Sequence, residues 1–147
     1  DRDGDGLIEY AQKFRSSEGK RDGLFWPTTE GEPLSPLGPL AAQVKSEGYS
    51  AKDARPVPLH GYYYRILTSQ GKDALGGAYD YMVRGNMIGG YALVAYPARW
   101  GASGVMTFIC NHDGVAYEKS LGEKTAEIAS KMTQYNPDSS WQKVERQ

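Results

Sequence analysis

Cysteine, histidine, long apolar runs and an excess of one charge are all scarce in this chain. The single cysteine, Cys110, excludes a disulfide within the chain. No apolar run approaches the roughly 20 residues that a membrane-spanning helix needs. The 17 Lys and Arg residues are scattered among 18 Asp and Glu residues, which leaves a net charge of −1. We therefore expect no transmembrane segment, no polybasic membrane patch and no nucleic acid as a partner.

The conventional catalytic side chains are few: Cys110, His60 and His112. A cysteine–histidine pair needs both side chains within hydrogen-bond reach. Cys110 and His112 lie two positions apart in a predicted strand, which would separate their side chains by roughly 7 Å. The same residues are too dispersed for a zinc site. We expect no catalytic residues and a non-enzymatic protein, with Cys110 as a buried small apolar side chain.

An acidic loop opens the chain. Carboxylates at its first, third and fifth positions and a glycine at its sixth have the spacing with which one tight loop wraps calcium. The predicted ligands are Asp1, Asp3, Asp5, the Leu7 carbonyl, Glu9 and Gln12. Because Gln12 stands where a bidentate Glu normally closes the shell, we expect weak calcium binding, on the order of 10⁻⁴–10⁻³ M. The alternative is a solvated turn in which Asp5 caps a helix that begins at Leu7.

The 147 residues suffice for a single domain with its own core. We expect a helix and loop segment over 1–59, an antiparallel sheet over 60–120, and a C-terminal helix and tail over 121–147. Together these predict an α+β fold. Because the chain starts inside a motif and without Met, we expect it to be the C-terminal part of a longer exported protein.

Helical spacing of apolar residues predicts helices over 7–16, 40–47 and 123–134. Residues 19–39 are rich in Gly and Pro and predict an ordered loop held by Phe25 and Trp26. Strands are predicted over 60–68, 79–84, 87–96, 105–111 and 115–117. Gly85-Asn86 and Asp113-Gly114 are typical hairpin turns between them. The prediction is an antiparallel meander of four to five strands over about 60–118.

Two of the predicted strands, 87–96 and 105–110, are apolar on both faces. An antiparallel sheet with one side in water normally shows one polar face. Either helices of this chain cover both faces, or one face is covered from outside it. We expect the second, with the chain's own missing N-terminal region, a protein partner or a second copy as the cover.

The segments in this order resemble a bacterial protein family, domain-of-unknown-function family 2950. The matching stretches are 3–11, 19–27 (Gly-Lys-Arg-Asp-Gly-Leu-Phe-Trp-Pro), 35–40, 60–67 (His-Gly-Tyr-Tyr-Tyr-Arg-Ile-Leu), 76–81 and 104–108. The resemblance implies export to the periplasm or another extracytoplasmic location, and no established activity. A looser similarity to the globular domains of type II secretion pseudopilins rests on Gly90-Tyr91 and on 107–117. It implies a pseudopilin-like sheet, although this chain has no long N-terminal helix and no prepilin methylation segment.

These observations favour a non-catalytic module for interaction or assembly in the cell envelope, with a loop that calcium would stiffen. The alternative is an envelope hydrolase or small-ligand binder that uses the tyrosine-rich sheet together with His60, Arg65 and Asp80. A cleft in which those three side chains converge would favour the alternative.

Overall fold

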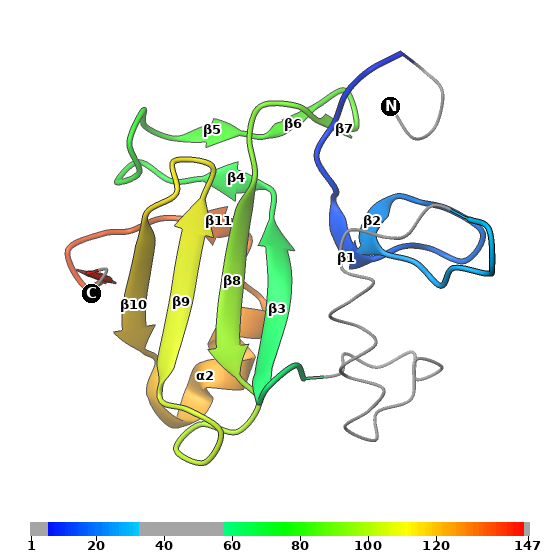
Figure 1. Cartoon of the computed structure of the whole chain (residues 1–147). Coiled ribbons are helices and arrows are strands. Elements are labelled where there is room, and N and C mark those ends of the chain that lie inside the picture. The colour runs from blue at the N-terminus through cyan, green and yellow to red at the C-terminus, as the bar shows by residue number, and fades with distance from the viewer. Residues whose placement is uncertain (1–5, 33–57, 146–147) are drawn as a thin grey trace.

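A five-stranded antiparallel sheet organises the computed structural model, which describes residues 6–32 and 58–145 (Figure 1). Its strand order is β12 (Gln142–Lys143), β10 (Ala116–Ser120), β9 (Met106–Asn111), β8 (Ala92–Pro97) and β3 (Tyr62–Leu67). Each neighbouring pair runs antiparallel. The prediction of an antiparallel sheet accompanied by helix is therefore confirmed in its coarse form, but the predicted strand 79–84 is wrong, because it divides into β5 (Tyr79–Asp80) and β6 (Met82–Val83), which pair outside this sheet.

Smaller elements surround this sheet. They are β1 (Lys13–Arg15), β2 (Gly23–Phe25), β4 (Ser69–Gln70), β5 (Tyr79–Asp80), β6 (Met82–Val83), β7 (Asn86–Met87), β11 (Gln134–Tyr135), a 3₁₀ turn at Gly122–Lys124 and the helix α2 (Thr125–Ser130). Strands β11, β4 and β5 form a three-stranded sheet, β6 and β7 a hairpin, and β1 and β2 a parallel pair. No helix among the described residues is long and apolar enough to span a membrane.

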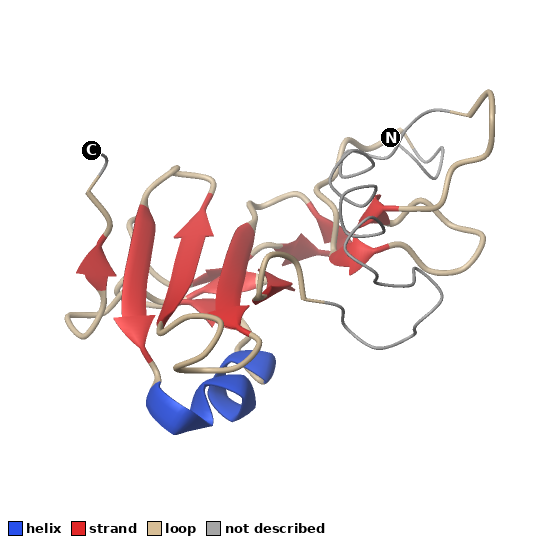
Figure 2. Ribbon diagram, turned by 60° about the horizontal axis from the view of Figure 1, so that its bottom comes forward, coloured by secondary structure: helices blue, strands red, loops and turns tan. Residues whose placement is uncertain are grey.

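One face of the main sheet is covered by α2, which lies on a single side of the strands (Figure 2). Val94, Tyr96 and Ile109 point to this side and pack in one cluster with Ala129 of α2. Arg65 joins the helix to the sheet, because its guanidinium donates to the carbonyl oxygens of Ala129 at 2.7 Å and Met132 at 2.9 Å. A cation at the last carbonyls of a helix is favourable, since those groups lack partners within the helix.

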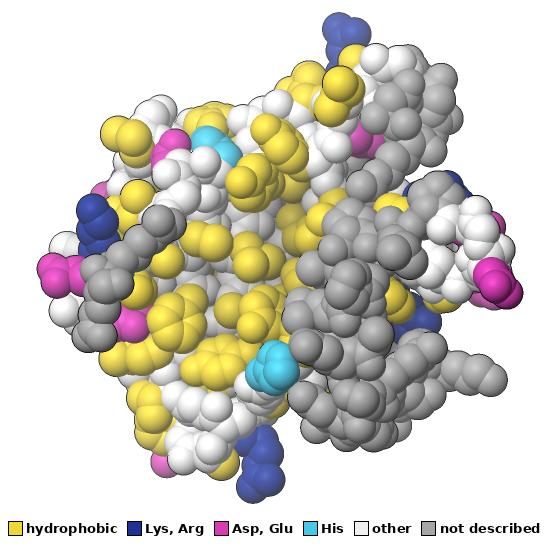
Figure 3. All heavy atoms as spheres, in the orientation of Figure 1, with side chains coloured by type: hydrophobic (Ala, Val, Ile, Leu, Met, Phe, Trp, Pro, Cys, Tyr) yellow, Lys and Arg dark blue, Asp and Glu magenta, His cyan; other side chains and the backbone are white. Residues whose placement is uncertain are grey.

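The opposite face of the main sheet is apolar and half-buried. Cross-strand register places Tyr64, Ala95 and Phe108 in one row, and Ile66, Leu93 and Cys110 in the next. We call these six residues the open face. In the orientation of Figure 3, hydrophobic side chains gather over the middle of the main sheet. The predicted double apolar character is confirmed, and α2 accounts for one face only; cover from outside the chain stays a prediction.

The predicted helix over 7–16 is wrong. Residues 7–12 have no regular structure and are followed by strand β1. Leu7 is 42% and Ile8 is 87% exposed, so these two apolar side chains do not pack against the core as the predicted helix required. Phe14 instead stacks on Tyr64 of β3, with ring centroids 5.7 Å apart. Tertiary contacts override a weak local preference here.

The other two predicted helices have different outcomes. The segment 40–47 lies outside the described residues. The helix predicted over 123–134 exists but ends at Ser130. Its C-terminal carbonyls are bound by Arg65, and the chain then turns back so that Thr68 donates its amide to the Thr133 carbonyl.

Both predicted hairpin turns exist, one of them shifted by a residue. Val83 pairs with Asn86, so the two turn residues are Arg84 and Gly85 rather than Gly85 and Asn86. Both have positive φ, 51° and 87°, as a two-residue turn of this hand requires. The second turn follows the prediction, with the Gly114 amide donating to the Asn111 carbonyl at 2.9 Å.

Candidate functional site

The predicted calcium ligands fall in two groups. Asp1, Asp3 and Asp5 lie outside the described residues. Leu7 is exposed, while Glu9 and Gln12 are half-buried and bind other parts of the chain. Gln12 Nε2 donates to the Gly85 carbonyl at 2.8 Å and to Glu9 Oε2 at 3.4 Å. No three His, Cys, Asp or Glu side chains gather as a metal site within residues 6–32 and 58–145.

Residues 7–12, which we call the N-terminal strap, lie against the β6–β7 hairpin (Figure 1). The Tyr10 amide donates to the Met87 carbonyl at 2.8 Å, and the Met87 amide donates to Glu9 Oε2 at 3.2 Å. The Tyr10 ring lies 4.9 Å from that of Tyr91, just beyond the hairpin. A ligand that restrained the acidic loop would therefore also restrain the β6–β7 hairpin, through the contacts of the N-terminal strap.

Cys110 and His112 are held in separate environments. Cys110 is half-buried on the open face, and burial raises the pKa of its thiol, which disfavours the nucleophilic thiolate. His112 Nδ1 accepts the Tyr91 amide at 3.3 Å. The ring proton of neutral His112 is therefore on Nε2, which lies 3.4 Å from Tyr79 Oη. This arrangement fixes the loop before β8 and presents no activated nucleophile, so we still expect thiol reagents to label Cys110 slowly in the native protein.

The three side chains of the alternative function are not brought together. Arg65 is bound to the end of α2. Asp80 lies in β5, beyond the end of the main sheet at which β3 terminates. Its carboxylate accepts a hydrogen bond from the Met82 amide at 2.8 Å. His60 precedes β3 at the opposite end and is exposed, with a φ of 50°. His60, Arg65 and Asp80 therefore do not converge in one cleft, the arrangement that would favour the alternative of an envelope hydrolase or small-ligand binder.

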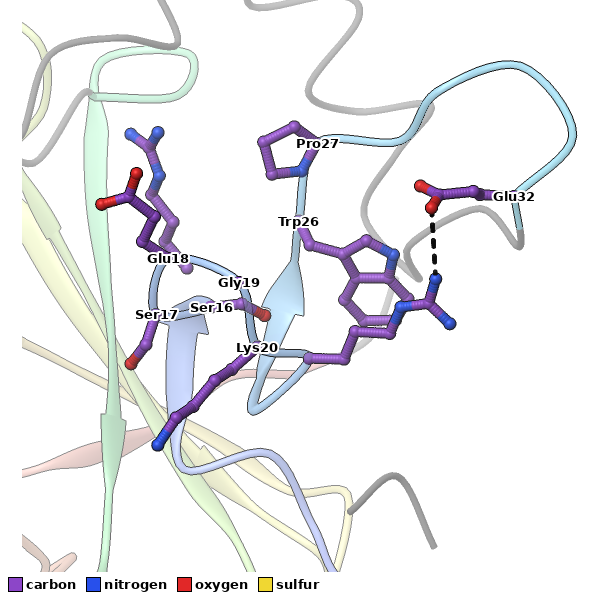
Figure 4. A pocket seen from close by; sticks show the side chains of 10 residues that line it. Ser16, Ser17, Glu18, Gly19, Lys20, Trp26, Pro27 and Glu32 are labelled. Carbon is purple, nitrogen blue, oxygen red and sulfur yellow. Dashed lines mark ion pairs between the residues drawn. The ribbon is translucent and has the colours of Figure 1, made fainter. Parts of the chain in front are cut away.

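A pocket of about 640 Å³ lies where the β1–β2 pair meets the turn that ends at Glu32 (Figure 4). Its lining residues are Arg15, Ser16, Ser17, Glu18, Gly19, Lys20, Arg21, Trp26, Pro27 and Glu32. In Figure 4, Trp26, Pro27 and Glu32 stand on one side and Ser17 and Glu18 on the other. We call this the Trp26 pocket.

Close packing of β1 on β2 shapes this pocket. A Cβ added to Gly23 would lie 2.6 Å from the Ser16 nitrogen, a distance that real Cβ atoms do not adopt. The Gly23 amide also donates to Ser16 Oγ at 2.9 Å. Glycine at this position therefore allows the two strands to approach. Trp26 comes directly after β2 and is 7% exposed, so its side chain forms the buried wall of the pocket.

Cations outnumber carboxylates around the Trp26 pocket. Three lining residues are basic and two are acidic. The nearby Asp22 does not redress the balance, because its carboxylate binds Lys13 Nζ at 2.9 Å and the Ser17 amide at 2.7 Å. The side-chain hydrogen bond from Lys13, followed by the bond from the Ser17 amide, lowers the pKa of Asp22 well below its usual range.

Sequence reasoning missed this pocket. The stretch 19–27 carries part of the resemblance to the family, and Phe25 and Trp26 predict an ordered loop rather than a binding site. Lys20 and Arg21 lie six and five positions before Trp26, a spacing that gives no reason to group them. Strand β2 turns the chain so that the indole and these cations line one hollow.

The described fold is mostly β, with a five-stranded antiparallel sheet that carries one short α-helix. The chain belongs to a family described as "Protein of unknown function (DUF2950)", whose model matches residues 1–144. Comparisons with curated proteins and with solved structures find no significant match. The family predicted from the quoted stretches is thus confirmed, while the similarity to pseudopilins is not shown.

Proposed function

We propose that this chain is a non-catalytic interaction or assembly module of the bacterial cell envelope, and that the open face of its main sheet binds another protein. The observation on which this rests is the open face itself. Six apolar side chains in two cross-strand rows stay only half-buried, although the other side of the same sheet has a complete core.

The composition of this face supports a protein as the occupant. Aromatic side chains and a methionine are typical of the centre of protein interfaces, and charges are depleted there. Tyr62 and Met106 flank the open face on the same side of the sheet, since each lies two positions from one of its residues; the ring centroids of Tyr62 and Phe108 are 6.1 Å apart. The nearest charge in the cross-strand rows is Glu118, which pairs with Phe108 in the register of β10 and lies towards the edge of the sheet.

Calcium belongs to the same proposal as a stiffening ion. The spacing of Asp1, Asp3 and Asp5 supports it, and the N-terminal strap supplies a route to the folded domain. Glu9 and Gln12 already bind the β6–β7 hairpin. A cation held by the preceding carboxylates would reduce the freedom of the strap and so stabilise its contacts with the hairpin.

Site-specific photo-crosslinking in the producing cell tests the interaction. A benzophenone-bearing phenylalanine analogue replaces Phe108 on the open face, or Tyr79 as the matched aromatic control. Tyr79 is 38% exposed and lies in β5, away from the open face. We expect a discrete protein adduct from position 108 and none from position 79, in the periplasmic or membrane fraction.

A second variant separates a specific contact from mere proximity. Leu93→Glu places a carboxylate in the middle of the open face and should abolish the adduct formed at position 108. Circular dichroism of the purified variant verifies that it still folds. The absence of any adduct at position 108, or equal adducts from positions 108 and 79, would show that this face does not bind a protein.

A further inference from the structure

We propose that the Trp26 pocket is a binding site for a small oxyanion, a phosphate or carboxylate group, with Arg21 as its principal ligand. This site is separate from the open face and does not depend on the proposed interaction function. It lies in the β1–β2 segment, on the far side of β3 from the centre of the main sheet (Figure 1).

The state of Arg21 supports this assignment. Its guanidinium carbon lies 5.8 Å from the centroid of the Trp26 ring, so the indole holds the flat group in place. Its only carboxylate contact among the described residues is with Glu32 at 3.9 Å, the ion pair marked in Figure 4. That distance exceeds the 2.7–2.9 Å typical of a charge-assisted hydrogen bond. A positioned guanidinium with a distant counter-ion is well suited to a two-pronged contact with an oxyanion.

Lys20 adds a second cation to the same pocket. Within the described part of the chain its ammonium has no carboxylate within ion-pair distance, and Lys20 lines the pocket with its side chain extended away from Trp26 and Glu32 (Figure 4). Asp22, two residues after Lys20, is bound to Lys13 and the Ser17 amide and cannot neutralise Lys20 without breaking those contacts. The Lys20 side chain is flexible, so it can swing onto a bound anion.

Glu32 is then a competitor for Arg21 within the pocket. Its side chain is 47% and that of Arg21 is 42% exposed, so solvent weakens their attraction. A phosphate or carboxylate group that approaches Arg21 closely would displace this contact. Removal of the Glu32 charge should therefore tighten anion binding, whereas removal of the Arg21 fork should weaken it.

Titration of the whole 147-residue chain, followed by amide and indole resonances in NMR, tests the proposal. The probes are inorganic phosphate and citrate, added in separate experiments with sodium chloride adjusted to constant ionic strength. We expect saturable shifts at the Trp26 indole and the amides of 17–21, in the millimolar range, and none at the indoles of Trp100 and Trp141. The phosphate and citrate titrations show which oxyanion the pocket prefers.

Three variants make the result decisive. Arg21→Gln should weaken binding at least about tenfold, as the loss of a charge-assisted contact predicts. Glu32→Gln should tighten it severalfold, and Arg99→Gln, an exposed arginine in the loop after β8, should leave it unchanged. The proposal is overturned if neither probe gives saturable shifts in the pocket, or if Arg21→Gln binds as the unaltered chain does.

Discussion

Replacement of Arg65 by Met should cost this domain a large part of its stability. The Arg65 guanidinium donates to the Ala129 carbonyl at 2.7 Å and to the Met132 carbonyl at 2.9 Å. A hydrogen bond from a charged group contributes about 1.5–3 kcal/mol. Ala129 keeps part of its bonding through the Met132 amide at 3.3 Å, so we expect a loss of about 3 kcal/mol rather than the full sum. For a domain of this size that corresponds to a fall of roughly 6–12 °C in the melting temperature.

Urea unfolding followed by circular dichroism measures this loss, with thermal melts as an independent check. Arg65→Lys should recover about half of it, since an ammonium can still reach one carbonyl. Arg99→Met is the matched control, because it removes the same charge from an exposed position. If Arg65→Met is within about 1 kcal/mol of Arg99→Met, then Arg65 does not hold α2 on the sheet.

Three further predictions concern the N-terminal segment. Gly23→Ala should lower stability by about 2 kcal/mol in a thermal melt, because its Cβ would lie 2.6 Å from a backbone nitrogen at the end of β1; an unchanged melt would contradict the close packing. Because the folded-state pKa of Asp22 is lowered, its contribution is fully present above the unfolded value near pH 4 and is lost progressively as the pH falls from there through the folded-state pKa; Asp22→Asn should therefore destabilise the protein at pH 7 by under about 1 kcal/mol and by progressively less as the pH falls below 4. Millimolar calcium should raise the melting temperature, and Asp3→Ala should remove that rise. Gln12→Glu should melt lower in chelator, since a carboxylate cannot donate to the Gly85 carbonyl, and should gain more from calcium; identical curves with calcium and chelator would show that the loop binds no calcium.

The central sheet could be predicted from the sequence because its information is local. Strands such as 105–111 combine β-branched and aromatic residues, and the Asp113-Gly114 turn brings β9 and β10 together without help from distant residues. The one-residue shift at Arg84-Gly85 shows the limit of this reasoning. By residue type Asn86 suits a turn as well as Arg84 does. In the structure Asn86 pairs with Val83 across the hairpin, so Arg84 and Gly85 form the turn.

The N-terminal segment could not be predicted in the same way, because its conformation depends on partners far away in the sequence. Helical spacing in 7–16 was real, but Phe14 finds a better neighbour in Tyr64, some fifty residues later. The Trp26 pocket could not be predicted for a different reason: its residues are close in sequence, but they line one hollow only once β2 pairs in parallel with β1. Parallel strands are not joined by a two-residue hairpin turn, so the sequence between β1 and β2 carries no short motif that predicts their pairing.

The two sides of the main sheet show how far a pattern of apolar residues can be interpreted. Alternation in β8 and β9 predicts that both faces avoid water, but it cannot tell which face receives the chain's own helix. Arg65 makes that choice, because its guanidinium needs carbonyl acceptors and finds them at the end of α2. Its neighbours on β3, Tyr64 and Ile66, then necessarily point to the other side. The open face therefore lies opposite the side on which Arg65 binds the end of α2.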